Sequence, residues 1–218
     1  VELSSQASLI RLRDFEWIIG GNIAFTNNEI KSLGGYGQKT MEYSDGATVV
    51  SRVGGNPYEF YGLQANGVYS TQAEADEANL VNSSSQVYQV GDVRFVDQNN
   101  DGRIDTKDRV SLGSATPDFF GGFFTSFRYR HFTLSAEFAY SKGNKAYNAV
   151  RRTLESASSF SNQSVAVSNR WNVEGQITDI PRATYGDAIG NNNFSSRWIE
   201  DASYLRMKNI TLGYNFDK

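Results

Sequence analysis

Five segments of the sequence alternate apolar and polar residues with a period of two, which is the pattern of β-strands whose two faces meet different surroundings. Trp17, Ile19 and Ile23 share one face of the second segment, while Glu16 and Asn22 lie on the other. The pattern predicts strands at residues 1–11, 15–27, 119–130, 132–141 and 203–216. Segments of this length are long enough to cross a bilayer as tilted strands, which need about 9–11 residues. We therefore expect an all-β fold of antiparallel, membrane-spanning strands.

The connections between these segments are uneven in length. Residues 11–14 and 130–131 form tight, charged turns, and His131, the single histidine, lies in one of them. By contrast, residues 28–117 and 142–202 are long, polar and rich in Gly, Asn and Ser. Short turns at one end of the strands and long loops at the other are typical of outer-membrane barrels. Loops of this length are uncommon inside compact soluble domains.

The first long loop contains an acidic stretch, DQNNDGRIDTKD at residues 97–108, with the spacing of a twelve-residue calcium loop. Its expected ligands are the side chains of Asp97, Asn99, Asp101, Asp105 and Asp108 and the backbone carbonyl of Arg103. Gly102 at the sixth position permits the sharp turn. Because Asp108 stands where such loops usually have the longer Glu, Mg²⁺ is an alternative to a structural Ca²⁺.

A metal-free turn is an alternative interpretation of this stretch, whereas an EF-hand is not. Asp, Asn and Gly also favour turns that need no metal, so a metal-free turn stays open. An EF-hand is not expected, because the residues before the loop are β-branched and aromatic. Pro117 and the pair Gly121 and Gly122 are incompatible with a regular second helix.

Composition removes several classes of function. The chain has no cysteine, which excludes disulfides, zinc–thiolate sites and thiol nucleophiles. Its net charge is −3 and it has no run of basic residues, so we expect no nucleic-acid partner. No apolar stretch is long enough for a spanning helix. A catalytic triad would have to use His131 in a solvated turn, and no glycine-rich stretch has the features of a phosphate loop, so we do not expect an enzyme.

Several motifs, in order along nearly the whole chain, resemble those of SusC/RagA-type TonB-dependent outer-membrane transporters. They are GGNPYEFYG at residues 54–62, GDVRFVD at 91–97, PDF at 117–119, GNKAYN at 143–148, RW at 170–171, DIPRA at 179–183 and SYLRMKNITLGY at 203–214. Each motif is weak alone, but their order makes the resemblance specific.

The resemblance implies that residues 1–218 are the C-terminal part of a 22-stranded barrel in the cell outer membrane, in contact with its lipid. The plug domain would precede this chain, and TonB would act through that upstream region. Such transporters import large nutrients, glycans or peptides, together with a SusD-like surface lipoprotein. The two long loops would then be extracellular.

Aromatic residues of the long loops are candidates for stacking on sugars or for contact with the lipoprotein, although packing within the loops is the expected role of most of them. These residues are Tyr36, Tyr58, Phe60, Tyr61, Tyr69, Phe160, Trp171, Tyr185 and Phe194. No residue is assigned to a substrate.

The same strands and acidic loop allow a second interpretation, a secreted calcium-stabilised β-sandwich that binds carbohydrate. In that case Phe15, Trp17 and Ile19 would share one enclosed core with Phe132, Leu134 and Phe138, between two sheets.

Overall fold

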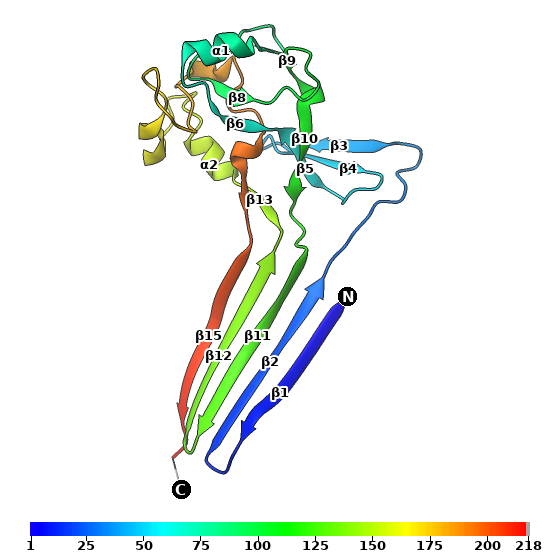
Figure 1. Ribbon diagram of the computed structural model, residues 1–218, viewed down its shortest axis with the longest axis vertical. Coiled ribbons are helices and arrows are strands. Elements are labelled where there is room, and N and C mark those ends of the chain that lie inside the picture. The colour runs from blue at the N-terminus through cyan, green and yellow to red at the C-terminus, as the bar shows by residue number, and fades with distance from the viewer. Residues whose placement is uncertain (217–218) are drawn as a thin grey trace. The chain divides into compact units, whose positions relative to one another are not determined.

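The computed structural model describes residues 1–216 (Figure 1). The chain divides into two compact units, each built from separate parts of the sequence. The first, the sheet unit, comprises Val1–Glu29, Ser114–Lys145 and Asp201–Lys218. The second, the loop unit, comprises Ile30–Gly113 and Ala146–Glu200. Among residues 1–216, no helix has the length and apolar character needed to span a membrane.

The sheet unit contains one sheet of five antiparallel strands in the order β1-β2-β11-β12-β15. The strands are β1 (Glu2–Arg11), β2 (Phe15–Phe25), β11 (Phe119–Tyr129), β12 (Phe132–Lys142) and β15 (Tyr204–Tyr214). All five strands predicted from the alternating pattern are confirmed, although β2 ends two residues earlier than expected. His131 lies in the turn between β11 and β12, as predicted.

Ring contacts and a close backbone approach organise one face of this sheet. Trp17 stacks on Phe127 with ring centroids 5.3 Å apart, and Phe123 stacks on Phe138 at 4.7 Å. Tyr140 crosses over Gly121, and its hydroxyl donates to the carbonyl oxygen of Asn22 at 3.0 Å. A Cβ at position 121 would lie 2.1 Å from that same oxygen, so the crossing requires glycine.

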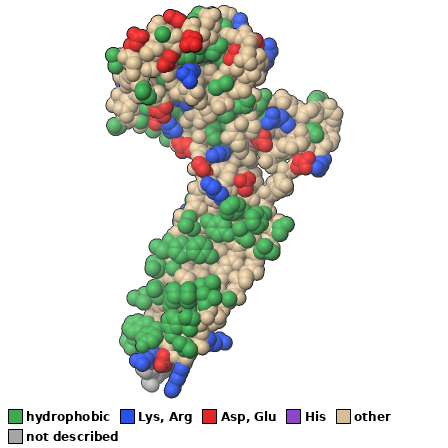
Figure 2. All heavy atoms as spheres, viewed as in Figure 1, with side chains coloured by type: hydrophobic (Ala, Val, Ile, Leu, Met, Phe, Trp, Pro, Cys, Tyr) green, Lys and Arg blue, Asp and Glu red, His purple; other side chains and the backbone are tan. Residues whose placement is uncertain are grey.

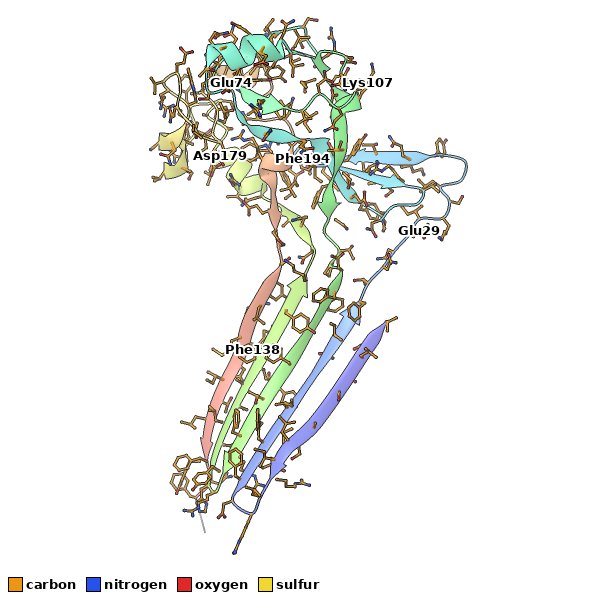
Figure 3. The ribbon with its side chains drawn as sticks, in the orientation of Figure 1. Glu29, Glu74, Lys107, Phe138, Asp179 and Phe194 are labelled. Atoms are coloured by element: carbon orange, nitrogen blue, oxygen red, sulfur yellow. The ribbon has the colours of Figure 1, made fainter. Side chains whose placement is uncertain are left out.

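This apolar face is open rather than enclosed. Leu134 is 41% exposed, Ile210 is 60% exposed and Leu212 is 73% exposed. Figure 2 shows hydrophobic side chains over the visible face of the sheet, with charged side chains gathered near its ends. Phe138, labelled in Figure 3, belongs to this face. The β-sandwich interpretation is therefore wrong, since it requires these side chains to be enclosed between two sheets.

Two irregularities interrupt the period of two. The pairing of β1 with β2 shifts between Ser8 and Ile10, and the pairing of β15 with β12 shifts where Asn209 and Met207 oppose consecutive residues of β12. Each shift inserts one extra residue, Leu9 or Lys208, which is the geometry of a β-bulge. The alternation predicted from Asn209 onward lies beyond this second shift, where the pairing with β12 is regular.

The loop unit contains short strands, short helices and 3₁₀ turns. A four-stranded sheet has the order β10-β5-β4-β3, formed by β10 (Arg109–Ser114), β5 (Glu59–Leu63), β4 (Thr48–Arg52) and β3 (Gln38–Glu42). The remaining strand pairs are β6 (Ala65–Val68) with β8 (Val93–Phe95), β7 (Val81–Asn82) with β9 (Arg103–Ile104), and β13 (Lys145–Tyr147) with β14 (Ile199–Asp201). The helices are α1 (Gln72–Ala78), α2 (Ala149–Leu154), η1 (Thr106–Asp108), η2 (Val165–Asn169), η3 (Tyr185–Asp187) and η4 (Ser196–Trp198).

The loop unit has its own hydrophobic core, to which both long segments contribute. Its buried members are Leu63, Tyr69, Ala75, Tyr88, Val93, Phe95, Ile104 and Ile189. Helix α1 presents Ala75 to this core. Thr71 caps its N-terminus, where the hydroxyl accepts from the Glu74 amide at 3.3 Å, and Asn79 caps its C-terminus in the left-handed conformation. The long connections between strands are thus folded around a shared apolar centre.

Candidate functional site

The acidic stretch lies in the loop unit between β8 and β10, and Lys107 marks its position in Figure 3. Its tightest part is at Asn100 and Gly102, which have φ values of +56° and +78°. Gly102, at the sixth position, therefore has the left-handed backbone conformation that glycine adopts without steric cost. Ile104 follows in β9 and is only 3% exposed, so the loop is anchored in the core.

The first half of the stretch wraps around its own amide groups. Asp97 accepts from the amides of Asp101 at 3.3 Å and Gly102 at 2.8 Å. The Asn99 Oδ1 atom also accepts from the Asp101 amide, at 3.1 Å. Asp101 in turn accepts from the Arg103 amide at 3.0 Å. Three of the predicted ligands, Asp97, Asn99 and Asp101, thus belong to one interlocked turn.

The other two side-chain ligands form a separate arrangement around η1. Asp105 accepts from the Lys107 amide at 2.7 Å, and Asp108 accepts from the Asp105 amide at 2.8 Å, which together form a capping box. The second oxygen of Asp108 accepts from the Gln98 amide at 2.9 Å, and its side chain is fully buried. Asp108 therefore links the start of the stretch to its end.

Electrostatic contacts stabilise the ionised form of Asp101. Its pKa lies below the ordinary value, first because Asn99 donates a hydrogen bond to its carboxylate and further because Lys107 and Arg103 are close. The Lys107 ammonium is 3.7 Å from Asp101. Within residues 1–216, no three acidic or histidine side chains converge as a set of metal ligands. The Arg103 guanidinium points away to the carbonyl of Ser83 at 3.2 Å.

A buried ion pair joins the two long segments of the loop unit. Asp92 is fully buried, and Arg182 donates to its two carboxylate oxygens at 2.8 and 3.1 Å. Asn191 donates to the same carboxylate at 3.0 Å, and its own Oδ1 accepts from the Val93 amide at 2.8 Å. The Gln89 amide also donates to Asp92, at 2.9 Å. Every oxygen of this buried carboxylate is thus satisfied, as buried charges require.

A glycine beside this pair allows the segments to approach closely. Gly91 has a φ of +84°, and a Cβ there would lie 2.5 Å from the ring of Trp171. The Arg182 amide donates to the Gly91 carbonyl at 2.8 Å, while the Gly91 amide donates to the Tyr69 carbonyl at 2.8 Å. Residues of three chain segments therefore meet within one hydrogen-bonded cluster.

The loop aromatics divide into packed and exposed groups. Tyr69 and Phe194 are buried, and Phe60, Tyr61 and Trp171 are half-buried. The exposed group consists of Tyr36, Tyr58, Phe160 and Tyr185, of which Phe160 and Tyr185 have ring centroids 5.2 Å apart.

Sequence reasoning did not single out Asp92, Arg182 or Asn191. These residues fall within or near motifs that carry the family resemblance, but about 90 residues separate Asp92 from Arg182. No local spacing rule connects positions so far apart. The one local signal is that Asp92 lies between Val90 and Val93, since a carboxylate that becomes buried beside such apolar residues requires a partner.

Known proteins resemble this chain along almost its whole length. A TonB-dependent receptor of Formosa agariphila is 31% identical over 217 residues, which are 98% of this chain and 21% of the receptor. The TonB-dependent receptor SusC of Bacteroides thetaiotaomicron is 27% identical over 221 residues, covering 99% of this chain and 20% of SusC. The chain thus spans about a fifth of the length of these relatives. No family model matches the chain.

Solved structures also share this fold. A chain of the RagAB peptide transporter superposes with a TM-score of 0.73 and 21% identity, over 98% of this chain and 22% of that one. A RagAB structure in an open state gives a TM-score of 0.70. The fold is accordingly part of a large antiparallel β-barrel. By sequence and by fold, it belongs to the SusC/RagA-type family of TonB-dependent receptors.

Proposed function

We propose that the chain is a segment of an outer-membrane active transporter that imports large nutrients, glycans or peptides, with energy supplied through TonB. One observation carries the proposal: five strands of 10 or 11 residues present an open apolar face, in a chain that is similar to a TonB-dependent receptor over 98% of its length. Strands of that length cross a bilayer, and lipid is the surrounding that an exposed apolar face requires.

The proposal includes an orientation in the membrane. The short turns at residues 12–14 and 130–131 face the periplasm, and the loop unit faces the cell exterior. To test this orientation, a peptide epitope is inserted into the full-length transporter after Asn162, and in a matched variant after Arg13. Antibody should label the first in intact cells and the second only after permeabilisation. The reverse pattern would contradict the orientation.

Transport itself is tested in the native host. Deletion of the gene should abolish growth on the substrate, and a protonophore should block its uptake by wild-type cells, because TonB draws on the inner-membrane gradient. Glycan mixtures and peptide mixtures form separate arms of the assay. Unchanged growth of the deletion strain in both arms would refute the proposal.

A SusD-like surface lipoprotein is the proposed partner. The RagAB neighbours are described as a peptide transporter and importer, and the loop unit offers exposed aromatic side chains such as Phe160 and Tyr185. Purification of the tagged full-length transporter in mild detergent should yield a stoichiometric lipoprotein. Its absence from a preparation that still binds substrate would count against this partner.

We also propose that residues 97–108 bind a structural Ca²⁺, with Mg²⁺ as the alternative. Four carboxylates and only two basic side chains occupy this stretch, so a divalent cation would offset the excess of negative charge. In the full-length protein, Ca²⁺ should slow proteolysis of the stretch relative to a chelator, and Mg²⁺ is run beside it. The double variant Asp97→Ala/Asp101→Ala should lose that protection, while Asp76→Ala on α1 should keep it. Equal cleavage of the wild type with and without either cation would remove the site.

A further inference from the structure

The loop unit contains a cavity of about 510 Å³, within the range of small-ligand sites. Both long segments supply its lining, since Glu42, Asp105 and Arg109 come from the first and Arg152 from the second. Its apolar part consists of Leu63, Ile104 and Phe194, all of them buried; Phe194 is labelled in Figure 3. The cavity thus combines an apolar floor with charged walls.

One of its two arginines is already neutralised. The Arg109 guanidinium is 3.0 Å from the carboxylate of Glu42. Each of these groups has its opposite charge within the protein, and neither requires a charged group from a ligand.

The second arginine is held in place without being neutralised. Arg152 donates through Nε to the carbonyl of Asn192 at 2.9 Å and through Nη1 to the carbonyl of Asp45 at 2.8 Å. Nη1 also lies 3.4 Å from the Tyr147 hydroxyl. These neutral acceptors fix the guanidinium but leave its charge intact. Within residues 1–216 no carboxylate forms an ion pair with Arg152. Its charge does act on the carboxyl of Asp187, where it opposes the rise in pKa that burial causes.

The cavity wall also contains a carboxylate without a cationic partner in the described part of the chain. Asp105 is half-buried, and one of its oxygens accepts from the Lys107 amide at 2.7 Å. Lys107 itself pairs with Asp101 at 3.7 Å instead. The cavity therefore presents one fixed positive group and one negative group, each unneutralised and each from a different long segment.

We propose that this cavity binds a short zwitterionic peptide, with its carboxylate at Arg152 and its ammonium group at Asp105. This assignment rests on the proposed transport function and narrows its substrate class. Guanidinium–carboxylate recognition is strong and directional, which suits an arginine already fixed in position.

An acidic oligosaccharide fits the same walls less well. Its carboxylates would approach Arg152 but would offer no positive group to Asp105. Sugars stack on open aromatic faces, whereas Phe194 is 8% exposed and already contacts Tyr147 and Phe60, with ring centroids at 5.1 and 6.4 Å. Charge and surface shape both favour the peptide.

The test is calorimetric titration of the full-length, detergent-solubilised transporter with di-, tri- and tetra-alanine. It is run in chelating buffer and again with Ca²⁺, because a cation held by residues 97–108 would compete with the peptide for Asp105. We expect binding of at least one free peptide, and at least about tenfold weaker binding of its N-acetyl and C-amide forms, since each lacks one charge-assisted contact. Equal affinity of free and blocked peptides, or no binding of any free peptide, would overturn the proposal.

Variants locate the site. Arg152→Gln should weaken binding of the free peptide at least about tenfold and leave binding of the C-amide form unchanged. Asp105→Asn should also weaken binding of the free peptide at least about tenfold, but leave binding of the N-acetyl form unchanged. The charge-matched controls Lys39→Gln and Glu77→Gln lie outside the cavity and should bind as the wild type. Arg152→Lys keeps the positive charge, so it should bind the free peptide more tightly than Arg152→Gln does. This difference would show that Arg152→Gln loses peptide recognition rather than its fold. Wild-type affinity in Arg152→Gln would refute the site.

An oligogalacturonate is titrated in parallel. Its binding in an Arg152-dependent manner, with no peptide binding, would assign the cavity to acidic glycans and overturn the proposal. Uptake by cells is measured separately. A transporter that imports its nutrient but binds no peptide here refutes the site alone, while a protein that binds peptide but supports no import refutes the proposed function.

Discussion

The buried pair of Asp92 and Arg182 offers the sharpest test of how the loop unit is held together. Asp92 is 0% exposed and Arg182 is 34% exposed at their side chains. Replacing Asp92 by Asn keeps the shape but removes the charge, which leaves the guanidinium without its partner. Loss of one member of a buried pair costs about 3–5 kcal/mol, and water access to Arg182 places this case near 3 kcal/mol.

The result is measurable as hydrogen exchange in the full-length protein. Opening of the unit would become easier by about 3 kcal/mol, so exchange should accelerate roughly 100-fold. The reporting amides are those of Tyr69, Gly91 and Arg182, whose hydrogen bonds join the three segments of the cluster. Asp76→Asn on the exposed side of α1 serves as the matched control and should leave exchange unchanged.

A double variant separates the charge from the packing. Asp92→Asn combined with Arg182→Gln removes both charges and should recover part of the lost protection, since no unpaired guanidinium then remains. Unchanged exchange at the three amides in Asp92→Asn would refute the role of the pair. Equal acceleration in β11 and β12 would also refute it, because the effect would not be confined to the loop unit.

Three further outcomes are expected. Gly91→Ala should destabilise the loop unit, because the new Cβ meets Trp171 at a φ of +84°, and limited proteolysis should show faster cleavage than in wild type. Asp101 has a lowered pKa, so its contribution to the acidic loop is present above the ordinary value of 3.8 and lost as pH falls through the folded pKa; pepsin cleavage of residues 97–108, relative to an unfolded peptide of the same sequence, should rise in that range, and Asp101→Asn should reduce this rise. The Trp17 indole donates to the Thr125 hydroxyl at 2.9 Å, so Thr125→Val should lower the free energy of unfolding in vesicles by about 1 kcal/mol, whereas Thr125→Ser should not.

The long strands could be predicted because their information is local. Alternation in residues such as Phe132, Leu134 and Phe138 identifies a face without reference to any other segment. The bulges at Leu9 and Lys208 could not, because they depend on the pairing partner as much as on the strand itself. Within the loop unit, β7 and β9 contain only two residues each, which is too short for any periodic pattern.

The candidate sites also differ in how far each could be predicted from the sequence. The acidic stretch was recognisable because its oxygens fall within twelve consecutive residues, but the sequence did not reveal that Asp105 and Asp108 form a capping box apart from the first turn. The cavity near Arg152 left no trace in the sequence at all. Its walls come together only when Asp45 and Asn192 place their carbonyls around the guanidinium.

The shared core of the loop unit constrains how its two long segments can change during evolution. Ile189 from one long segment packs with Val93 and Phe95 from the other, so neither segment has a complete interior alone. A recombination event that exchanged residues 30–113 without residues 146–200 would separate Asp92 from Arg182 and divide the core between two ancestries. Productive exchange of loops between related proteins should therefore transfer both segments together, as a single discontinuous module.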